Sequence, residues 1–202
     1  MTYSVKGNRL QLGGNDVDFI ETPNMSGQVK PLYLVLHYTA GMTAEGAISW
    51  FKNRAAQASA HFVVDRDGSV TQMVPLNRIA WHAGKSSWQG VDGLNSYSIG
   101  IEIVNAGRLT RTEKGEWVNW ADNKVPPSEV TVLTHKNENH ASGWQIYTKA
   151  QLEKVYEIGS ALHDRFKFLD VLGHEDIAPG RKIDPGPGFP MISVASRIMG
   201  RK

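Results

Sequence analysis

The chain has 202 residues, of which 41% are hydrophobic and 21% are charged, as in ordinary globular proteins and unlike disordered ones. Its net charge of +2 is too small to indicate a nucleic-acid-binding protein. The absence of cysteine excludes disulfides and thiolate metal sites, so any bound metal must have nitrogen and oxygen ligands.

The length of the chain suits a single domain over residues 1–202. The N-terminus lacks the apolar core of a signal peptide, and no stretch approaches the roughly 20 apolar residues of a membrane span. We therefore expect a protein that is cytoplasmic as synthesised, inserts into no membrane and binds no nucleic acid. We also expect a monomer.

The first part of the chain predicts an arm, a central strand and a helix. Residues 1–30 alternate short apolar pieces with glycine and proline, which indicates a peripheral N-terminal arm. Residues 32–36 form a continuous apolar run, typical of a central strand covered on both faces, and His37 follows at its end. Thr43 can cap a helix over residues 43–54.

The middle of the chain predicts more strands and then an irregular region. Residues 60–64 and 69–74 flank an Asp-Gly turn and predict two antiparallel strands. Residues 98–104 predict a further strand, with Glu102 inside it. Residues 105–147 are polar and without a clear period, which predicts a loop-rich insertion of the kind that often carries function.

The last part of the chain completes an α/β pattern. Thr148 and Gln151 form a capping-box pattern that opens a helix over residues 148–166. A short strand at residues 171–172 and a closing helix at 192–199 follow. The expected fold is therefore a mixed central β-sheet flanked by helices.

Residues 173–186, with the sequence Gly-His-Glu-Asp-Ile-Ala-Pro-Gly-Arg-Lys-Ile-Asp-Pro-Gly, place a histidine and carboxylates between residues that interrupt regular structure. His174 and Asp184 are therefore expected on a shaped loop. Zinc hydrolases commonly use three protein ligands, and without cysteine the third ligand beside two histidines would be a carboxylate. His37, His174 and Asp184 fit this description, although their spacing alone is a weak signal.

Five short motifs occur in order along the chain: residues 36–40 (Leu-His-Tyr-Thr-Ala), 59–62 (Ser-Ala-His-Phe), 80–84 (Ala-Trp-His-Ala-Gly), 98–102 (Ser-Ile-Gly-Ile-Glu) and 173–186. Together they resemble the type 2 family of zinc-dependent N-acetylmuramoyl-L-alanine amidases. That family includes bacterial cell-wall amidases, phage endolysins and animal peptidoglycan-recognition proteins. The resemblance covers residues 31–189 and implies the fold of these proteins.

The resemblance also implies a role for each site residue. It makes His37, His174 and Asp184 the ligands of a zinc cofactor, Glu102 the catalytic carboxylate and Lys182 the group that stabilises the transition state. Zinc would activate water near neutral pH, while the carboxylate would transfer its proton to the departing amine. The structural alternatives are a core histidine for His37, an exposed strand carboxylate for Glu102, and a surface or ion-paired cation for Lys182.

Three more residues in the motifs are candidates for supporting roles. His61 and His82 could serve as alternative metal ligands, but the resemblance makes them supporting residues near the groove. There His82 or Trp81 could contact substrate. Structural packing is the competing interpretation for both histidines.

The implied reaction is hydrolysis of the amide bond between the lactyl group of N-acetylmuramic acid and L-alanine, with peptidoglycan or muropeptides as the partner. We expect an endolysin, which would act on the cell wall after release. The alternatives are a cytosolic muropeptide-recycling amidase and a non-catalytic peptidoglycan-binding module. A module of that kind would be expected to lack a metal ligand, and none is missing here.

Overall fold

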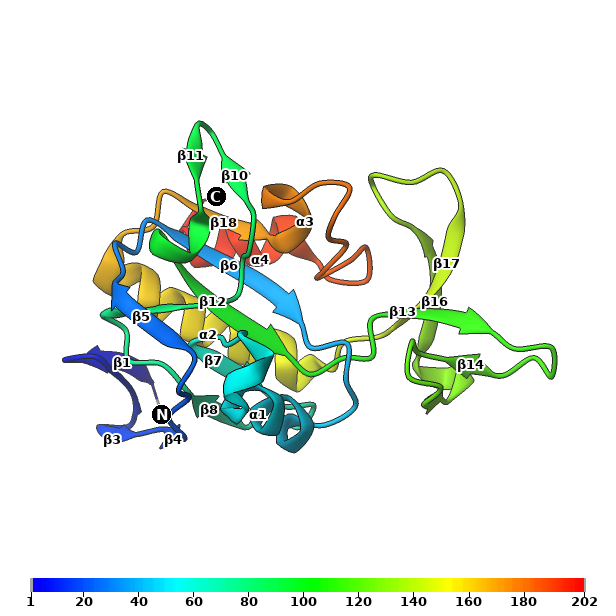
Figure 1. Cartoon of the computed structure of the whole chain (residues 1–202), viewed down its shortest axis with the longest axis horizontal. Helices are drawn as coiled ribbons and strands as arrows, with labels where there is room; N and C mark the ends of the chain where they lie inside the picture. Colours follow the sequence, from blue (N-terminus) through cyan, green and yellow to red (C-terminus); the bar gives the residue numbers. More distant parts are fainter. Residues whose placement is uncertain (1, 202) are drawn as a thin grey trace.

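A computed structural model describes residues 2–201 and has a mixed six-stranded sheet at its centre (Figure 1). The strand order is β18 (Asp170–Gly173), β6 (Tyr33–Tyr38), β12 (Ser98–Ile103), β7 (Phe62–Val64), β8 (Val70–Gln72) and β4 (Asp18–Phe19). The first four strands run parallel, β8 is antiparallel to β7, and β4 is parallel to β8. The mixed central sheet and its flanking helices confirm the expected fold class.

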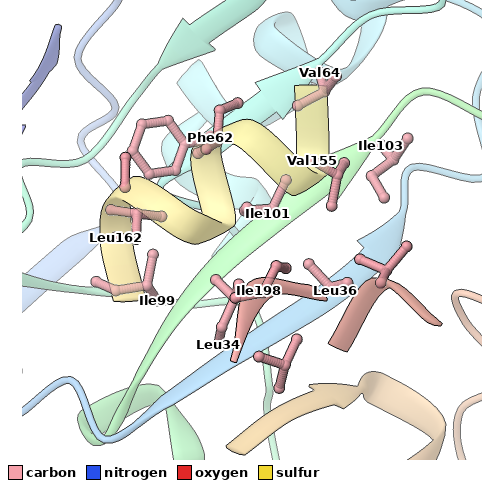
Figure 2. Close-up of a cluster of buried hydrophobic side chains, with 14 of the residues drawn as sticks. Leu34, Leu36, Phe62, Val64, Ile99, Ile101, Ile103, Val155, Leu162 and Ile198 are labelled. Atoms are coloured by element: carbon pink, nitrogen blue, oxygen red, sulfur yellow. The ribbon is translucent and has the colours of Figure 1, made fainter. Parts of the chain in front are cut away.

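Helices α2 (Lys149–Phe166) and α4 (Met191–Ile198) cover one face of this sheet. Side chains alternate between the two faces along a strand, so Leu34 and Leu36 of β6 point to the same side. They pack with Val155 of α2 and Ile198 of α4 in one buried cluster, part of which Figure 2 shows. Most of the hydrophobic core therefore lies between the strands and these two helices.

The other face of the sheet is covered by α1 (Ala44–Lys52) and by the chain between β9 (Arg78–Ala80) and β12. Because the strand period is two, His37 and Glu102 point to this second face, away from the large core. The two residues are register partners on neighbouring parallel strands. The sheet thus separates the main stabilising core from the candidate catalytic residues.

Both predicted helix starts are capped by the residues that the sequence indicated. The Thr43 hydroxyl accepts a hydrogen bond from Gly46 N at 3.1 Å, and α1 begins at the next residue. Thr148 and Gln151 form a reciprocal capping box at the start of α2. Each cap satisfies backbone N–H groups that the first helical turn leaves unpaired.

The N-terminal arm is a small antiparallel sheet that packs on the core. It consists of β1 (Tyr3–Lys6), β2 (Arg9–Leu12) and β3 (Asn15–Asp16), and buries Tyr3 and Leu10 in the cluster that contains α2. The chain then adds β4 to the central sheet and β5 (Met25–Gln28) to β9. The remaining short elements are β10 (Ser87–Trp88), β11 (Val91–Asp92), α3 (His174–Ile177) and 3-10 turns at Arg54–Ala56, Leu94–Ser96 and Pro127–Glu129.

The region expected to be loop-rich contains a second, five-stranded antiparallel sheet, which extends to one side of the central sheet (Figure 1). Its order is β15 (Lys124–Val125), β14 (Trp117–Val118), β13 (Arg108–Arg111), β17 (Ala141–Gln145) and β16 (Val130–Thr134). The prediction of irregular structure was wrong for these residues. Strands of two to five residues with few buried side chains give no detectable period-two pattern.

Within residues 2–201, the helices are too short or too polar to cross a lipid bilayer.

Truncation of Ile101 tests the position of the core. Ile101 of β12 is fully buried in the core cluster that includes α2, so Ile101→Ala should lower the free energy of unfolding by about 2–5 kcal/mol. Ile192→Ala is the matched control, since that side chain is 86% exposed and should change stability by less than about 0.5 kcal/mol. Equal losses in urea denaturation would contradict this assignment of the core.

Candidate active site

The candidate metal site forms where two adjacent parallel strands end. His37 is the fifth residue of β6, and His174 directly follows β18, the neighbouring strand. Carboxyl ends of parallel strands meet at the same edge of a sheet, where loops converge on ligands. A return of the chain after α3 then brings Asp184 to the same point. Residues separated by 147 positions in the sequence are thereby brought into contact.

The three predicted ligands lie within hydrogen-bonding distance of one another. His37 Nδ1 is 2.9 Å from His174 Nδ1, and each of these atoms is 3.0 Å from Asp184 Oδ2. All three side chains are buried, with relative exposures of 1%, 3% and 6%. Two imidazole nitrogens and one carboxylate oxygen around a single point form a donor set suited to a zinc ion.

The protonation states of this cluster also suit a cation. Burial, with the neighbouring His174, lowers the pKa of His37 to about 4, so its imidazole is neutral at pH 7. Burial by itself would raise the pKa of Asp184, but the two imidazoles at 3.0 Å outweigh it and hold that pKa below its ordinary value. Metal ligands must be deprotonated, and His37 and Asp184 meet that requirement.

The chain around Asp184 is fixed by contacts of its backbone. Glu175 N donates to Asp184 O at 2.9 Å, and the Tyr147 hydroxyl donates to Pro185 O at 2.7 Å. Gly173 permits this close return, because a Cβ at that position would lie 2.8 Å from Pro185 Cδ. The expectation that glycine and proline shape this segment therefore has a specific steric reason.

His174 differs from the expectation in one respect, because it begins the four-residue helix α3 and not an open loop. The Asp176 carboxylate accepts a hydrogen bond from Gly173 N at 2.7 Å and so satisfies a backbone donor at the start of the helix. Pro179, Gly180, Pro185 and Gly186, which suggested a loop, lie after this turn. Its four residues are too few to show helical periodicity in the sequence.

A groove of about 770 Å³ opens over the candidate metal ligands. Its wall includes the predicted residues His174, Asp184, Glu102 and Lys182. Three tryptophans from separate parts of the chain also line it, namely Trp50 of α1, Trp81 after β9 and Trp120 of the insertion. The groove thus combines polar groups that can act on a substrate with aromatic surfaces that can bind one.

Glu102 lies beside the candidate metal ligands, and the pKa of its carboxyl group is strongly perturbed. Its Oε2 atom is buried and has no hydrogen-bond partner within residues 2–201. Burial raises its pKa well above the ordinary value, the charge of Asp184 adds to this effect, and Lys182 opposes it. Glu102 is half-buried, and a carboxyl with one buried, unpaired oxygen in a groove suits a proton-transfer role better than an exposed strand carboxylate does.

Lys182 lines the groove. The nearby carboxylates of Glu175 and Asp176, which could have formed an ion pair with it, contact a different lysine. The ammonium group that contacts Glu175, at 2.9 Å, and Asp176 is that of Lys136, which lies on the insertion. The backbone of Lys182 is fixed by donation from its N–H to Ala178 O at 3.0 Å. Its ammonium group is therefore not occupied by these two carboxylates.

The three candidate supporting residues have different surroundings. Trp81 and His82 line the groove. His61 is buried away from it, since its Nε2 donates to Arg78 O at 3.0 Å and its Nδ1 accepts from Gly100 N at 3.1 Å. Neither His61 nor His82 belongs to the group of candidate metal ligands, and His61 does not line the groove.

Several residues that support the site had no signal in the sequence. His135, on the insertion, lies 2.7 Å from the buried carboxylate of Glu175, next to the metal ligand His174. Trp144 stacks on His135 and packs against Gly186, where a Cβ would lie 2.8 Å from the indole ring. These contacts join the insertion to the metal-binding segment.

Comparisons with known proteins show the family of the chain and its fold. Residues 27–187 match the family model described as N-acetylmuramoyl-L-alanine amidase. The 1,6-anhydro-N-acetylmuramyl-L-alanine amidase AmpD of Citrobacter freundii is 33% identical over 135 residues, which are 66% of this chain and 53% of that protein. The chain therefore spans about half the length of this curated relative.

Two solved structures are similar over most of the chain. A selenomethionine derivative of AmpD has a TM-score of 0.65 at 23% identity, over 95% of this chain and 98% of that one, and shows the fold. AmiD from Escherichia coli, bound to the substrate anhydro-N-acetylmuramic acid-L-Ala-D-γ-Glu-L-Lys, has a TM-score of 0.61 at 26% identity. That match covers 96% of this chain and 65% of the AmiD chain.

Replacement of Glu102 tests the electrostatics of the groove. In metal-free protein at pH 7, Glu102→Gln should raise the melting temperature by roughly 2–4 °C, or about 1 kcal/mol, because the amide avoids the cost of burying a charge. The folded state raises this pKa, so wild-type stability falls relative to the variant as pH increases above the ordinary value of 4.5. The difference should vanish near pH 4.

The measurement is calorimetry across this pH range, with Glu113→Gln as the control. Glu113 is exposed in the insertion, so its replacement should leave the melting temperature unchanged at every pH. A lower melting temperature for Glu102→Gln at pH 7 would contradict the description of this carboxyl.

Proposed function

We propose that this chain, which belongs to the N-acetylmuramoyl-L-alanine amidase family, hydrolyses the amide bond between the lactyl group of N-acetylmuramic acid and L-alanine. The observation that carries the proposal is the meeting of a His-His-Asp cluster, a half-buried carboxyl and a lysine at one groove. The reaction class is amide hydrolysis with metal assistance. The full ligand set argues against the non-catalytic binding module.

The cofactor that we propose is zinc, held by His37, His174 and Asp184. The fit rests on the chemistry of the donor set: two imidazoles and a carboxylate have their ligand atoms 2.9–3.0 Å apart and buried. When bound, zinc supplies Lewis acidity, which polarises an amide carbonyl and brings the pKa of water near 7.

Glu102 is the proposed proton carrier. It lies beside His37 in the sheet register, and its free Oε2 is close enough to the cluster for the charge of Asp184 to affect its pKa. Glu102 would accept a proton from the attacking water and donate it to the amine of L-alanine as the C–N bond breaks. A carboxyl without other hydrogen-bond partners is free for both transfers.

Lys182 is the proposed stabiliser of negative charge. Its side chain lines the same groove as Glu102, and the carboxylates that could neutralise it are paired with Lys136. Its ammonium group would stabilise the oxyanion that develops on the amide carbonyl oxygen. This role requires a cation that is fixed in position but not paired in the free protein.

For the substrate, we propose a soluble muropeptide with a 1,6-anhydro sugar, and not the intact cell-wall polymer. Two similarities support this choice: AmpD of Citrobacter freundii is named for this substrate, and the AmiD structure contains an anhydro-muropeptide. The recycling alternative is therefore better supported than the expected endolysin. The groove of about 770 Å³ has a volume that accommodates a sugar with a short peptide.

Chelation and replacement of Glu102 test the chemistry. Removal of metal should abolish release of L-alanine peptides from an anhydro-muropeptide, and one equivalent of zinc should restore it. Glu102→Ala should bind zinc with wild-type affinity but lose at least about 100-fold in kcat, since a proton-transfer group is removed. Full activity after complete metal removal would contradict the proposal.

A comparison of substrates by mass spectrometry separates the two biological roles. The recycling enzyme should act on soluble anhydro-muropeptides and release little from intact sacculi. Efficient release from sacculi would instead support the endolysin. Retention on sacculi without release of peptide from either substrate would support the binding module.

Trp120 should contribute to substrate binding. It is 79% exposed at the groove, and donation from its indole N–H to Ala40 O at 2.8 Å fixes its position. Such a large exposed ring can pack on the apolar face of a sugar. Trp120→Ala should raise KM about tenfold with little change in kcat, equivalent to about 1.4 kcal/mol of binding energy.

Val132→Ala is the control for this prediction. Val132 is 57% exposed on the same inserted sheet but does not line the groove, so its truncation should leave KM unchanged. An unchanged KM for Trp120→Ala as well would remove this residue from the substrate site.

A further inference from the structure

Two consecutive residues contact the outer nitrogens of both histidine ligands. His37 Nε2 lies 2.9 Å from His82 Nδ1, and His174 Nε2 lies 3.1 Å from Ala83 O. The ligand atoms that face the metal cluster are the opposite nitrogens, both Nδ1. One short segment of the chain, residues 82–83, thus reaches both imidazoles from outside the cluster.

The contact with Ala83 determines the tautomer of His174. A carbonyl oxygen can only accept a hydrogen bond, so the proton of a neutral His174 must be on Nε2. The Nδ1 atom then carries a lone pair and faces Asp184 Oδ2 at 3.0 Å. This arrangement directs an unprotonated nitrogen toward the metal.

The contact with His82 has the same effect on His37 through a chain of hydrogen bonds. The chain ends at Leu94 O, which can only accept, so the Ser98 hydroxyl donates to it at 2.6 Å. The Ser98 oxygen then accepts from His82 Nε2 at 3.3 Å, which leaves a lone pair on His82 Nδ1. His37 must therefore donate through Nε2, and its Nδ1 is free for a metal.

The segment that makes these contacts is fixed from several directions. The Asn95 side-chain oxygen accepts from His82 N at 3.0 Å and from Ala83 N at 2.7 Å. Arg181 donates to Ala83 O at 2.7 Å. Gly100 makes room for the imidazole of His82, because a Cβ there would lie 2.6 Å from its Cγ.

We propose that His82 is a positioning residue for the metal site, which acts by accepting the Nε2 proton of His37 and so presenting Nδ1 of that ligand. Ala83 O does the same for His174. This inference rests on the metal site of the proposed function. It replaces the expectation that His82 contacts substrate with a role in metal affinity.

The decisive comparison is between two replacements of His82. His82→Leu removes the acceptor and should weaken zinc binding about 10- to 100-fold. His82→Asn keeps an oxygen near the position of Nδ1 and should stay within about threefold of wild type. The measurement is competition for zinc with a chromophoric chelator, which requires no catalytic turnover.

The matched control is His61→Leu. His61 is another buried histidine near the same strands, but both of its nitrogens bond to backbone groups and neither contacts a ligand. Its replacement should lower the melting temperature without lowering zinc affinity. If His61→Leu and His82→Leu weaken zinc binding equally, general loss of packing explains the effect and the proposal is wrong.

A second variant and a spectroscopic readout keep the test independent of folding. If His82→Leu does not fold, Ser98→Ala removes the next acceptor in the chain and should weaken zinc binding about 3- to 10-fold. In long-range proton–nitrogen NMR spectra of the metal-free protein, neutral His37 should carry its proton on Nε2 in the wild type and in His82→Asn; a proton on Nδ1 in the wild type would contradict the positioning role.

The outcomes separate this inference from the function on which it rests. Wild-type zinc affinity in both His82→Leu and Ser98→Ala, or an asparagine variant as weak as the leucine variant, would overturn the positioning role and leave the amidase proposal intact. Failure of the wild type to bind zinc would overturn the metal site and the positioning role together.

Discussion

The close approach of His37 Nδ1, His174 Nδ1 and Asp184 Oδ2, 2.9–3.0 Å apart in a buried site, is the constraint on which the rest of the structure depends. In the metal-loaded tautomers that we propose, the hydrogen bonds on the outer side of the histidines direct lone pairs inward, so that three electron-rich atoms would face the cation. Such an arrangement is unfavourable unless a cation lies among them. The surrounding chain must therefore hold the atoms in place. It does so through the central sheet, through the backbone contacts of Asp184 and Pro185, and through residues 82–83.

The central sheet has the large hydrophobic core on one face and the candidate catalytic residues on the other. On β6 and β12, alternate side chains face α2 and α4 and form the large core, while those between them, which include His37 and Glu102, face the opposite side of the sheet. His37 and Glu102 can therefore occupy central strands without interrupting the packing of Leu36 or Ile101. The cost is a carboxyl beside other polar groups, whose pKa is raised by burial and by the charge of Asp184 and whose Oε2 has no hydrogen-bond partner within residues 2–201.

The inserted sheet contacts the site at two points and so contributes to both support and recognition. Its His135 contacts Glu175, next to a metal ligand, and its Trp120 stands at the groove with its indole fixed to Ala40 O. The same element thus contacts the segment that carries His174 and the surface that would meet the sugar. Its short strands make it the part of the fold with the weakest pattern in the sequence.

The sequence by itself determined the ligand types, the helix caps and the central strands, because each depends on residues that are close along the chain. Thr43, Thr148 and the apolar run before His37 are local signals of this kind. The resemblance also indicated His37, His174 and Asp184 as ligands. Only the tertiary structure decided how closely their ligand atoms approach, why His82 contacts a ligand and His61 does not, and which tryptophans face the groove. These outcomes depend on contacts between segments far apart in the sequence, and local periodicity carries no information about such distances.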